Sequence, residues 1–198
     1  ISANKQAELI ELVGSLSKTS DVMVISGSLP QGIESDYYTK LFNVAAPNTL
    51  KIADTEGDKL LAALKSGLDL VKPNKDELQN TLKQEFKSRD DLLKGCYALL
   101  DKGAQRVLLS LGKRGAIITD GTKNYYCKSI NVAINSTLGA GDGMVAAAAM
   151  QLEQGAPLDE ILRAGVAAGT ATVTTFGQIS FTKEKYDEIY ANIKVEEF

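Results

Sequence analysis

A glycine-rich turn that carries an acidic residue is the segment of this chain best suited to chemistry on an anion. Residues 137–143 read Thr-Leu-Gly-Ala-Gly-Asp-Gly, and an Ala-rich stretch follows at 144–150. Such a sequence exposes successive backbone N–H groups at the start of a helix, where unpaired donors and the helix dipole bind anions. An anion holder alone would not need the Asp142 carboxylate, which suits a general base that takes a proton from an attacking hydroxyl. The alternative is that Asp142 is an ordinary N-cap and the glycines serve helix packing.

A second polar segment follows a short apolar run. Residues 72–78 read Lys-Pro-Asn-Lys-Asp-Glu-Leu. Asn74 and Glu77 have the spacing of a capping box, in which each side chain accepts a backbone N–H from the other residue. Glu77 also offers an oxygen ligand of the kind Mg²⁺ prefers, directly or through water, and Lys72 offers a charge for phosphate oxygens. Both interpretations stay open, and neither excludes the other.

Two further loops follow predicted strands. Residues 110–116 read Ser-Leu-Gly-Lys-Arg-Gly-Ala, and small residues there would let the backbone approach a flat ligand such as a base and ribose. The alternative is a loop that carries turn glycines. Residues 26–32 read Ser-Gly-Ser-Leu-Pro-Gln-Gly and by themselves indicate a loop.

The residues that are absent exclude several function classes. The chain has no histidine, which excludes Ser-His-Asp and Cys-His catalysis and the common histidine zinc sites. It has neither the G-x-x-x-x-G-K-[ST] phosphate loop nor the G-x-G-x-x-G dinucleotide fingerprint. Cys96 and Cys127 are far apart, so we expect two buried, reduced thiols and a cytoplasmic location.

Composition and charge limit the classes of partner that this chain is expected to bind. The chain has 22 Lys and Arg against 25 Asp and Glu, a formal charge of −3 without a basic block, which argues against nucleic acid and anionic membranes. Its 198 residues, 44% of them hydrophobic, fit one globular domain. We expect no secretory leader, and no apolar run reaches the ~18–20 residues that a membrane span needs.

Alternating helices and strands must position these segments. We expect helices at 3–17, 35–46, 57–66, 75–84, 89–102, 140–153, 157–173 and 182–192, and strands at 21–25, 50–53, 68–71 and 106–109. Short apolar runs between helices indicate strands buried on both faces of a mostly parallel sheet, with helices on both sides. Residues 115–119 and 124–127 flank Asp-Gly and predict an antiparallel pair at one sheet edge. The prediction is a single α/β domain over 1–198, with ligands beyond the carboxyl ends of the strands.

Taken in order, the four segments resemble the ribokinase-like (PfkB-type) carbohydrate kinase family over essentially the whole chain. S-G-S-L-P-x-G at 26–32 together with K-P-N-x-x-E-L at 72–78 is most similar to its phosphosugar kinases, 1-phosphofructokinase and tagatose-6-phosphate kinase. The resemblance implies a three-layer α/β/α fold and ATP-dependent transfer to the primary hydroxyl of a phosphorylated ketohexose. It favours fructose 1-phosphate, giving fructose 1,6-bisphosphate, over tagatose 6-phosphate. A nucleotide-binding module without chemistry is the other hypothesis, which the retained Asp142 disfavours.

The resemblance also implies a role for each site residue. Asp142 is the expected base, and the expected anion hole is Gly139, Ala140 and Gly141. The expected nucleotide and phosphate contacts are Lys72, Asn74, Ser110, Gly112 and Gly115, with the loop after Ala168 near the base. Glu77 is expected to bind Mg²⁺, so the implied cofactors are ATP and Mg²⁺. The implied mechanism is positioning and charge stabilisation without a covalent intermediate.

One departure from the family is an absence. Members of the family carry a further amino-terminal stretch with a Gly-Gly-rich substrate motif, a sugar-binding Asp and a small β lid. This chain has no Gly-Gly pair and no segment suited to the lid, so it resembles the carboxyl-terminal two-thirds of such a kinase. We expect the 198-residue chain alone to have weak or no activity. For the full-length protein the resemblance implies phosphosugar binding and a homodimer built through the lid, which leaves the oligomeric state of this chain open.

Overall fold

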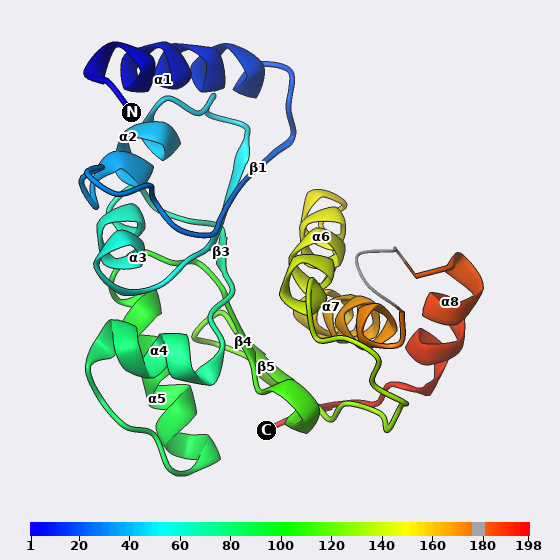
Figure 1. Cartoon of the computed structure of the whole chain (residues 1–198). Coiled ribbons are helices and arrows are strands. Elements are labelled where there is room, and N and C mark those ends of the chain that lie inside the picture. The colour runs from blue at the N-terminus through cyan, green and yellow to red at the C-terminus, as the bar shows by residue number, and fades with distance from the viewer. Residues whose placement is uncertain (176–180) are drawn as a thin grey trace. The chain divides into compact units, whose positions relative to one another are not determined.

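The computed structural model describes residues 1–175 and 181–198. These residues form two compact units, Ile1–Val107 and Leu108–Phe198, whose paths are traced in Figure 1. Whether the units form one domain, as the sequence predicts, stays a prediction. Within the described residues, no helix is both long and apolar enough to span a membrane.

The first unit consists of parallel strands and the helices that follow them. Its helices are α1 (Ala3–Ser17), α2 (Tyr37–Asn43), α3 (Gly57–Leu64), α4 (Lys75–Leu82) and α5 (Arg89–Leu100). Its strands are β1 (Val22–Ser26), β2 (Leu50–Asp54) and β3 (Leu70–Val71), with β4 (Val107–Ser110) beginning at its last residue. The pairs Ser26↔Asp54 and Ala53↔Val71 show that β1, β2 and β3 run in the same direction and end at one edge. The predicted loops after these strands therefore lie at that edge.

Neighbouring helices of this unit pack on one another. Helix α2 packs against α3, α3 against α4, and α4 against α5. The core of the unit includes Ile52 of β2, Leu60 of α3 and Leu78 of α4, which are fully buried. These elements confirm the predicted alternation of helices and parallel strands.

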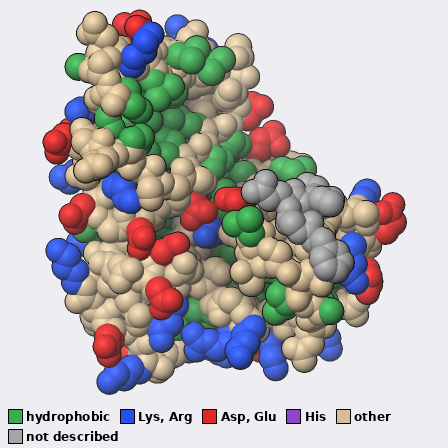
Figure 2. Space-filling model, viewed as in Figure 1, with side chains coloured by type: hydrophobic (Ala, Val, Ile, Leu, Met, Phe, Trp, Pro, Cys, Tyr) green, Lys and Arg blue, Asp and Glu red, His purple; other side chains and the backbone are tan. Residues whose placement is uncertain are grey.

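The prediction that β1 is buried on both faces is wrong. Val24 is 43% exposed and Ser26 is exposed, so the face that carries them is open. Among the described strands β1 pairs with β2 alone, and no layer of described side chains covers the face that carries Val24 and Ser26. Figure 2 shows hydrophobic side chains at the surface of the upper part of this unit, where α1 and β1 lie.

The second unit combines an antiparallel sheet with three helices. Strands β5 (Ala116–Thr119) and β6 (Asn124–Cys127) form the predicted hairpin, with Thr119 opposite Asn124. A third strand, β7 (Val195–Glu197), pairs antiparallel with β6 and was not predicted. The helices are α6 (Ala140–Glu153), α7 (Leu158–Val173) and α8 (Lys183–Asn192), and a short 3₁₀ turn, η1, spans Gly112–Arg114. The parallel strands, the antiparallel hairpin and the helices confirm the α/β class.

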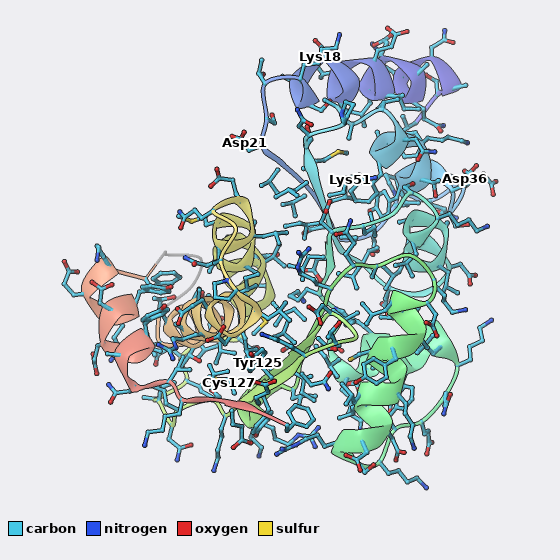
Figure 3. The ribbon with its side chains drawn as sticks, turned by 180° about the vertical axis from the view of Figure 1, so that it is seen from behind. Lys18, Asp21, Asp36, Lys51, Tyr125 and Cys127 are labelled. Atoms are coloured by element: carbon cyan, nitrogen blue, oxygen red, sulfur yellow. The ribbon has the colours of Figure 1, made fainter. Side chains whose placement is uncertain are left out.

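Both cysteines are free and buried, as predicted. Cys96 lies in α5, and Cys127 lies on β6, where Figure 3 labels it with Tyr125. Burial raises the pKa of each thiol to about 12. Both thiols are therefore protonated and unreactive at neutral pH.

Small residues let α6 and α7 approach each other closely. A Cβ atom added to Gly169 would lie 3.1 Å from the Ala140 carbonyl oxygen, and one added to Gly143 would lie 2.6 Å from Thr172 Oγ1. Larger side chains at these positions would push the helices apart. This contact fixes the amino-terminal turn of α6 on α7.

Candidate active site

The turn before α6 has the geometry of an anion site. Gly139 is the N-cap with φ +79°, and no side chain caps the helix. The Ala140 N–H donates to the Thr137 carbonyl at 3.3 Å, and the Gly143 N–H donates to the Gly139 carbonyl at 2.8 Å. The N–H groups of Gly141 and Asp142 meet no acceptor among the described residues, so two adjacent donors are left at the positive end of the helix dipole.

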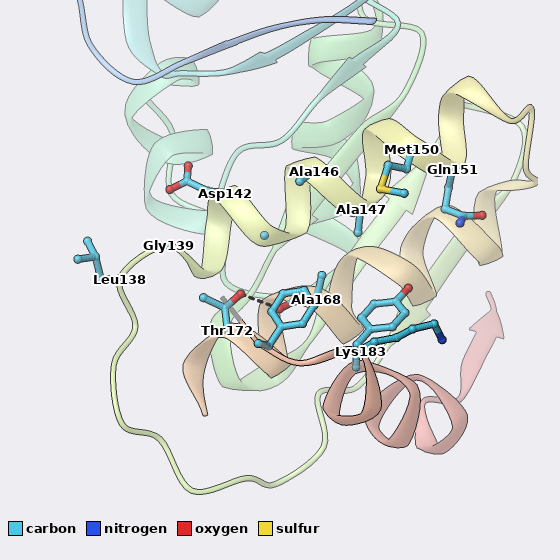
Figure 4. Close-up of a pocket in the computed structure, with 13 residues that line it drawn as sticks. Leu138, Gly139, Asp142, Ala146, Ala147, Met150, Gln151, Ala168, Thr172 and Lys183 are labelled. Carbon is cyan, nitrogen blue, oxygen red and sulfur yellow. Dashed lines mark hydrogen bonds between the residues drawn. The ribbon is translucent and has the colours of Figure 1, made fainter. Parts of the chain in front are cut away.

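Asp142 is not the N-cap, so that part of the alternative is wrong, whereas Gly143 does serve the packing of α6 on α7. It is the third residue of α6 and is exposed, and no described residue forms a hydrogen bond or ion pair with its carboxylate. Figure 4 shows the carboxylate at the amino-terminal end of α6, turned away from the helix. An accessible carboxylate beside free N–H donors can accept a proton from a hydroxyl.

The loop after β4 holds its shape through two glycines. The Leu111 N–H donates to the Gly115 carbonyl at 2.8 Å, and the Gly115 N–H donates to the Gly112 carbonyl at 2.9 Å. Gly115 has φ +94°, and a Cβ there would lie 1.8 Å from the Cys127 carbonyl oxygen. The turn-glycine interpretation therefore holds, and it leaves room for a binding role as well.

One cavity of about 240 Å³ joins this loop to the α6 turn. Ser110, Gly112 and Gly115 line it together with Ala140 and Gly141, although the two segments are far apart in the sequence. Sequence reasoning missed the rest of the lining, which includes residues 129–132, Thr170 and Val173. No motif marks these residues, because they form the connection after β6 and one side of α7.

A larger cavity of about 910 Å³ lies on the other side of the same turn, along α6, α7 and α8. Gly139 and Asp142 line it, together with Ala146, Ala147 and Met150 from the next turns of α6 (Figure 4). The first turn of α6 therefore separates two cavities. Ala140 and Gly141 face one of them, and Asp142 faces the other.

The expectation of a loop after Ala168 is wrong, because Ala168 lies inside α7, which continues to Val173. It lines the larger cavity rather than the smaller one. Part of the segment that follows α7, residues 176–180, lies outside the described residues.

In the first unit, Asn74 and Glu77 form the predicted capping box at the start of α4. The Asn74 N–H donates to Glu77 Oε2 at 2.7 Å, and the Glu77 N–H donates to Asn74 Oδ1 at 2.9 Å. Burial raises the pKa of Glu77; the Asn74 N–H and Lys72 lower it, and the carboxylates of Asp54 and Glu56 raise it. Glu77 therefore shares one charged neighbourhood with Lys72, Asp54 and Glu56.

Lys72 is buried and paired, which the sequence did not reveal. Its Nζ lies 2.9 Å from Asp54 Oδ1, and the two side chains are 5% and 14% exposed. Asp54 is the last residue of β2, and Lys72 follows the last residue of β3. The strand ends therefore bring a cation and a carboxylate together.

The residues present fit a water-bridged Mg²⁺ better than a protein cage. In the part of the chain that the structure describes, no group of three or more acidic, Cys or His side chains could hold a metal ion. Magnesium at phosphate sites typically uses one or two carboxylates together with phosphate oxygens and waters. Glu77 gives one oxygen to the Asn74 N–H and has a second oxygen for that purpose.

Comparison with known proteins identifies relatives over most of the chain. A family model described as "pfkB family carbohydrate kinase" matches residues 1–185. ATP-dependent 6-phosphofructokinase isozyme 2 of Escherichia coli is 38% identical over 173 residues, which are 86% of this chain and 56% of the relative. D-tagatose-1-phosphate kinase of Bacillus licheniformis is 35% identical over 89% of this chain and 59% of its own length. The 1-phosphofructokinase of Borreliella burgdorferi is 33% identical over 90% of this chain and 58% of its own length.

Solved structures agree with the ribokinase-like fold. Phosphofructokinase-2 from Escherichia coli in complex with potassium has a TM-score of 0.89 at 35% identity, covering 96% of this chain and 62% of that structure. The same enzyme in complex with fructose-6-phosphate has a TM-score of 0.84 at 34% identity, with the same coverage. The chain thus spans less than two thirds of the length of these relatives.

Proposed function

The chain belongs to the pfkB family of carbohydrate kinases, and from that premise we propose that it carries the nucleotide site and the catalytic base of a sugar-phosphate kinase. The reaction is ATP-dependent phosphoryl transfer to the primary hydroxyl of a phosphorylated ketohexose. One observation carries the proposal: the first turn of α6 has two N–H donors that meet no acceptor among the described residues, and it lies between a cavity that reaches the 110–115 loop and a cavity that Asp142 lines.

The smaller cavity is the nucleotide side. Ser110, Gly112 and Gly115 present backbone against a base and ribose, and the cavity continues to Ala140 and Gly141. A phosphate chain that follows it arrives at the free N–H groups of Gly141 and Asp142. Donors already in place stabilise the charge that develops on the phosphoryl oxygens, because they need no reorganisation during the reaction.

Asp142 serves the acceptor side. Its carboxylate takes the proton of the acceptor hydroxyl as that oxygen forms its bond to the phosphorus, and the bond from the phosphorus to the ADP oxygen breaks. In the first unit Lys72 would contact phosphate oxygens, and Glu77, which the capping box with Asn74 holds in place, would bind Mg²⁺ directly or through water. Bound Mg²⁺ would supply charge neutralisation on the phosphates.

The favoured acceptor is fructose 1-phosphate, which the S-G-S-L-P-x-G motif at 26–32 supports. The relatives include two phosphofructokinases and a tagatose-phosphate kinase, and one solved relative holds fructose-6-phosphate. A phosphorylated ketohexose is common to these names. Rates of the full-length protein with fructose 1-phosphate, fructose 6-phosphate and tagatose 6-phosphate rank the candidates.

Titration of Mg·ATP into the folded 198-residue chain, followed by calorimetry, tests the nucleotide site. We expect binding that Gly141→Leu abolishes or weakens, because a bulky side chain would enter the smaller cavity. Ala3→Leu adds the same side chain at an exposed position of α1 and is expected to change nothing. A well-folded chain that does not bind Mg·ATP contradicts the proposal.

A further inference from the structure

The Lys72 ammonium occupies an unusual position for a lysine. Its side chain is 5% exposed, and lysines are rarely so buried unless they are paired. Asp54 provides the pair at 2.9 Å and is itself 14% exposed. Because an isolated buried charge is costly, the position of the ammonium depends on this carboxylate.

The backbone fixes the pair from both sides. Ala53 and Val71 are register partners, so the next residues along the two parallel strands, Asp54 and Lys72, point to the same face. The Lys72 N–H donates to the Ala53 carbonyl at 3.0 Å. On the other side, the Gly27 N–H donates to the Asp54 carbonyl at 3.0 Å. Asp54 is therefore held between two strand ends.

Lys72 has another carboxylate within electrostatic reach. It lowers the pKa of Glu77, which Asp54 and Glu56 raise. Without Asp54, the ammonium would be drawn toward the remaining carboxylates or leave the buried position for solvent. The Asp54 contact decides where the positive charge lies.

We infer that Asp54 is a positioning residue, which holds the Lys72 ammonium at the carboxyl edge of β3 so that it can meet phosphate oxygens. An ammonium has three N–H donors, and the contact with Asp54 leaves two for a phosphate. The inference rests on the proposed function, because it deepens the phosphate role of Lys72. Asp54 itself does not touch the phosphate; it acts through the lysine.

The test is a double-mutant cycle read by ligand affinity. Wild type, Asp54→Asn, Lys72→Met and the double variant are titrated with Mg·ATP and, separately, with AMP. We expect Asp54→Asn to weaken Mg·ATP binding by about tenfold or more, as the loss of a charge-assisted contact does. AMP lacks the β- and γ-phosphates, so the affinity for AMP should fall much less. General damage to the fold would instead weaken the binding of both ligands.

In the Lys72→Met background, Asp54→Asn is expected to change Mg·ATP affinity by less than about twofold. This comparison stays informative if Asp54→Asn alone does not fold, because the double variant removes both charges and leaves neither unpaired. A larger effect of Asp54→Asn in that background, or an equal loss for ATP and AMP, overturns the inference. If wild type fails to bind Mg·ATP, the proposed function falls with it; if wild type binds and only the cycle fails, the inference alone falls.

Discussion

Among single residues, Asp142 carries the chemical claim. Asp142→Asn removes the proposed base while leaving the N–H groups of α6 in place, so the full-length protein is expected to lose roughly 10²–10⁴ in rate. Mg·ATP affinity should be largely kept, because the carboxylate lies on the side away from the smaller cavity. A coupled assay gives the rate and calorimetry gives the affinity. An unchanged rate would reject the base and favour a nucleotide-binding module without chemistry.

Gly115 tests the shape of the loop at residues 110–115, where we propose that the nucleotide binds. Gly115→Ala would place a Cβ 1.8 Å from the Cys127 carbonyl oxygen, at φ +94°. Strain at such a backbone conformation costs about 1–3 kcal/mol, and the clash adds to it, so we expect a loss of roughly 3 kcal/mol or more in urea unfolding. Gly112→Ala is the control: it also has positive φ, but its Cβ meets nothing within 4 Å, so a cost of about 1–2 kcal/mol is expected. Equal costs would mean that the contact with Cys127 is not tight.

Glu77 makes the free energy of unfolding depend on pH. Burial raises its pKa above the ordinary 4.5, so between the two values the folded chain binds more protons than the unfolded chain. The free energy of unfolding then falls as pH rises through that window. The stability of wild type minus that of Glu77→Gln is therefore expected to decrease with pH above 4.5. Urea unfolding at several pH values measures this difference.

Glu184 is the matched control for this pH dependence. A backbone hydrogen bond and the Thr182 hydroxyl lower its pKa, so wild type minus Glu184→Gln should increase with pH. If the stability of wild type minus that of Glu77→Gln does not change with pH, the Glu77 carboxyl is better solvated than its burial implies.

Among the elements, the contact between α6 and α7 fixes the position of the turn that ends at Gly139, before α6. Gly143→Ala would place a Cβ 2.6 Å from Thr172 Oγ1, and overpacking of this kind costs about 1–3 kcal/mol. In a Thr172→Ala background the obstacle is gone, and the better helix propensity of alanine should make the same change neutral or stabilising by up to ~1 kcal/mol. Thermal unfolding of the four variants measures the coupling. Additive effects would contradict the close approach.

The elements also show what a sequence can predict. Helix α6 begins and ends at the predicted residues, because the glycine turn and the Ala-rich stretch mark both its start and its length. Two strands behave differently. The run at 21–25 predicts a strand but says nothing of its neighbours, so the exposure of Val24 could not be foreseen. Strand β7 has three residues, too few for a periodic pattern, and forms because β6 offers it an edge.

For the whole molecule, the order of motifs predicted more of the site than local patterns did. Ser110 and Gly141 belong to two segments that the sequence describes independently of each other. The cavity that both residues line depends on how α6 packs against the loop at 110–115. The pair of Asp54 and Lys72 was missed for a related reason. Each residue follows its own strand, and only strand register makes them neighbours. Long-range pairing of this kind leaves no local pattern in the sequence.

Catalysis depends on more of the molecule than nucleotide binding does, because a kinase must hold two substrates at once. The chain spans 56% to 59% of the length of its three sequence relatives and 62% of the two solved structures. The roles proposed for its motifs concern the nucleotide, the anion hole and the base, and its sequence contains no Gly-Gly pair, which the family resemblance implies for the sugar site. A nucleotide bound without an oriented acceptor loses the proximity that accounts for much of the rate of such a reaction.

We therefore expect the 198-residue chain to bind Mg·ATP but to transfer phosphate to fructose 1-phosphate weakly or not at all, as measured by ADP release with and without the sugar. Robust sugar-dependent turnover by this chain would show that it already binds the acceptor, and that the larger cavity beside Asp142 is the first place to look for the sugar.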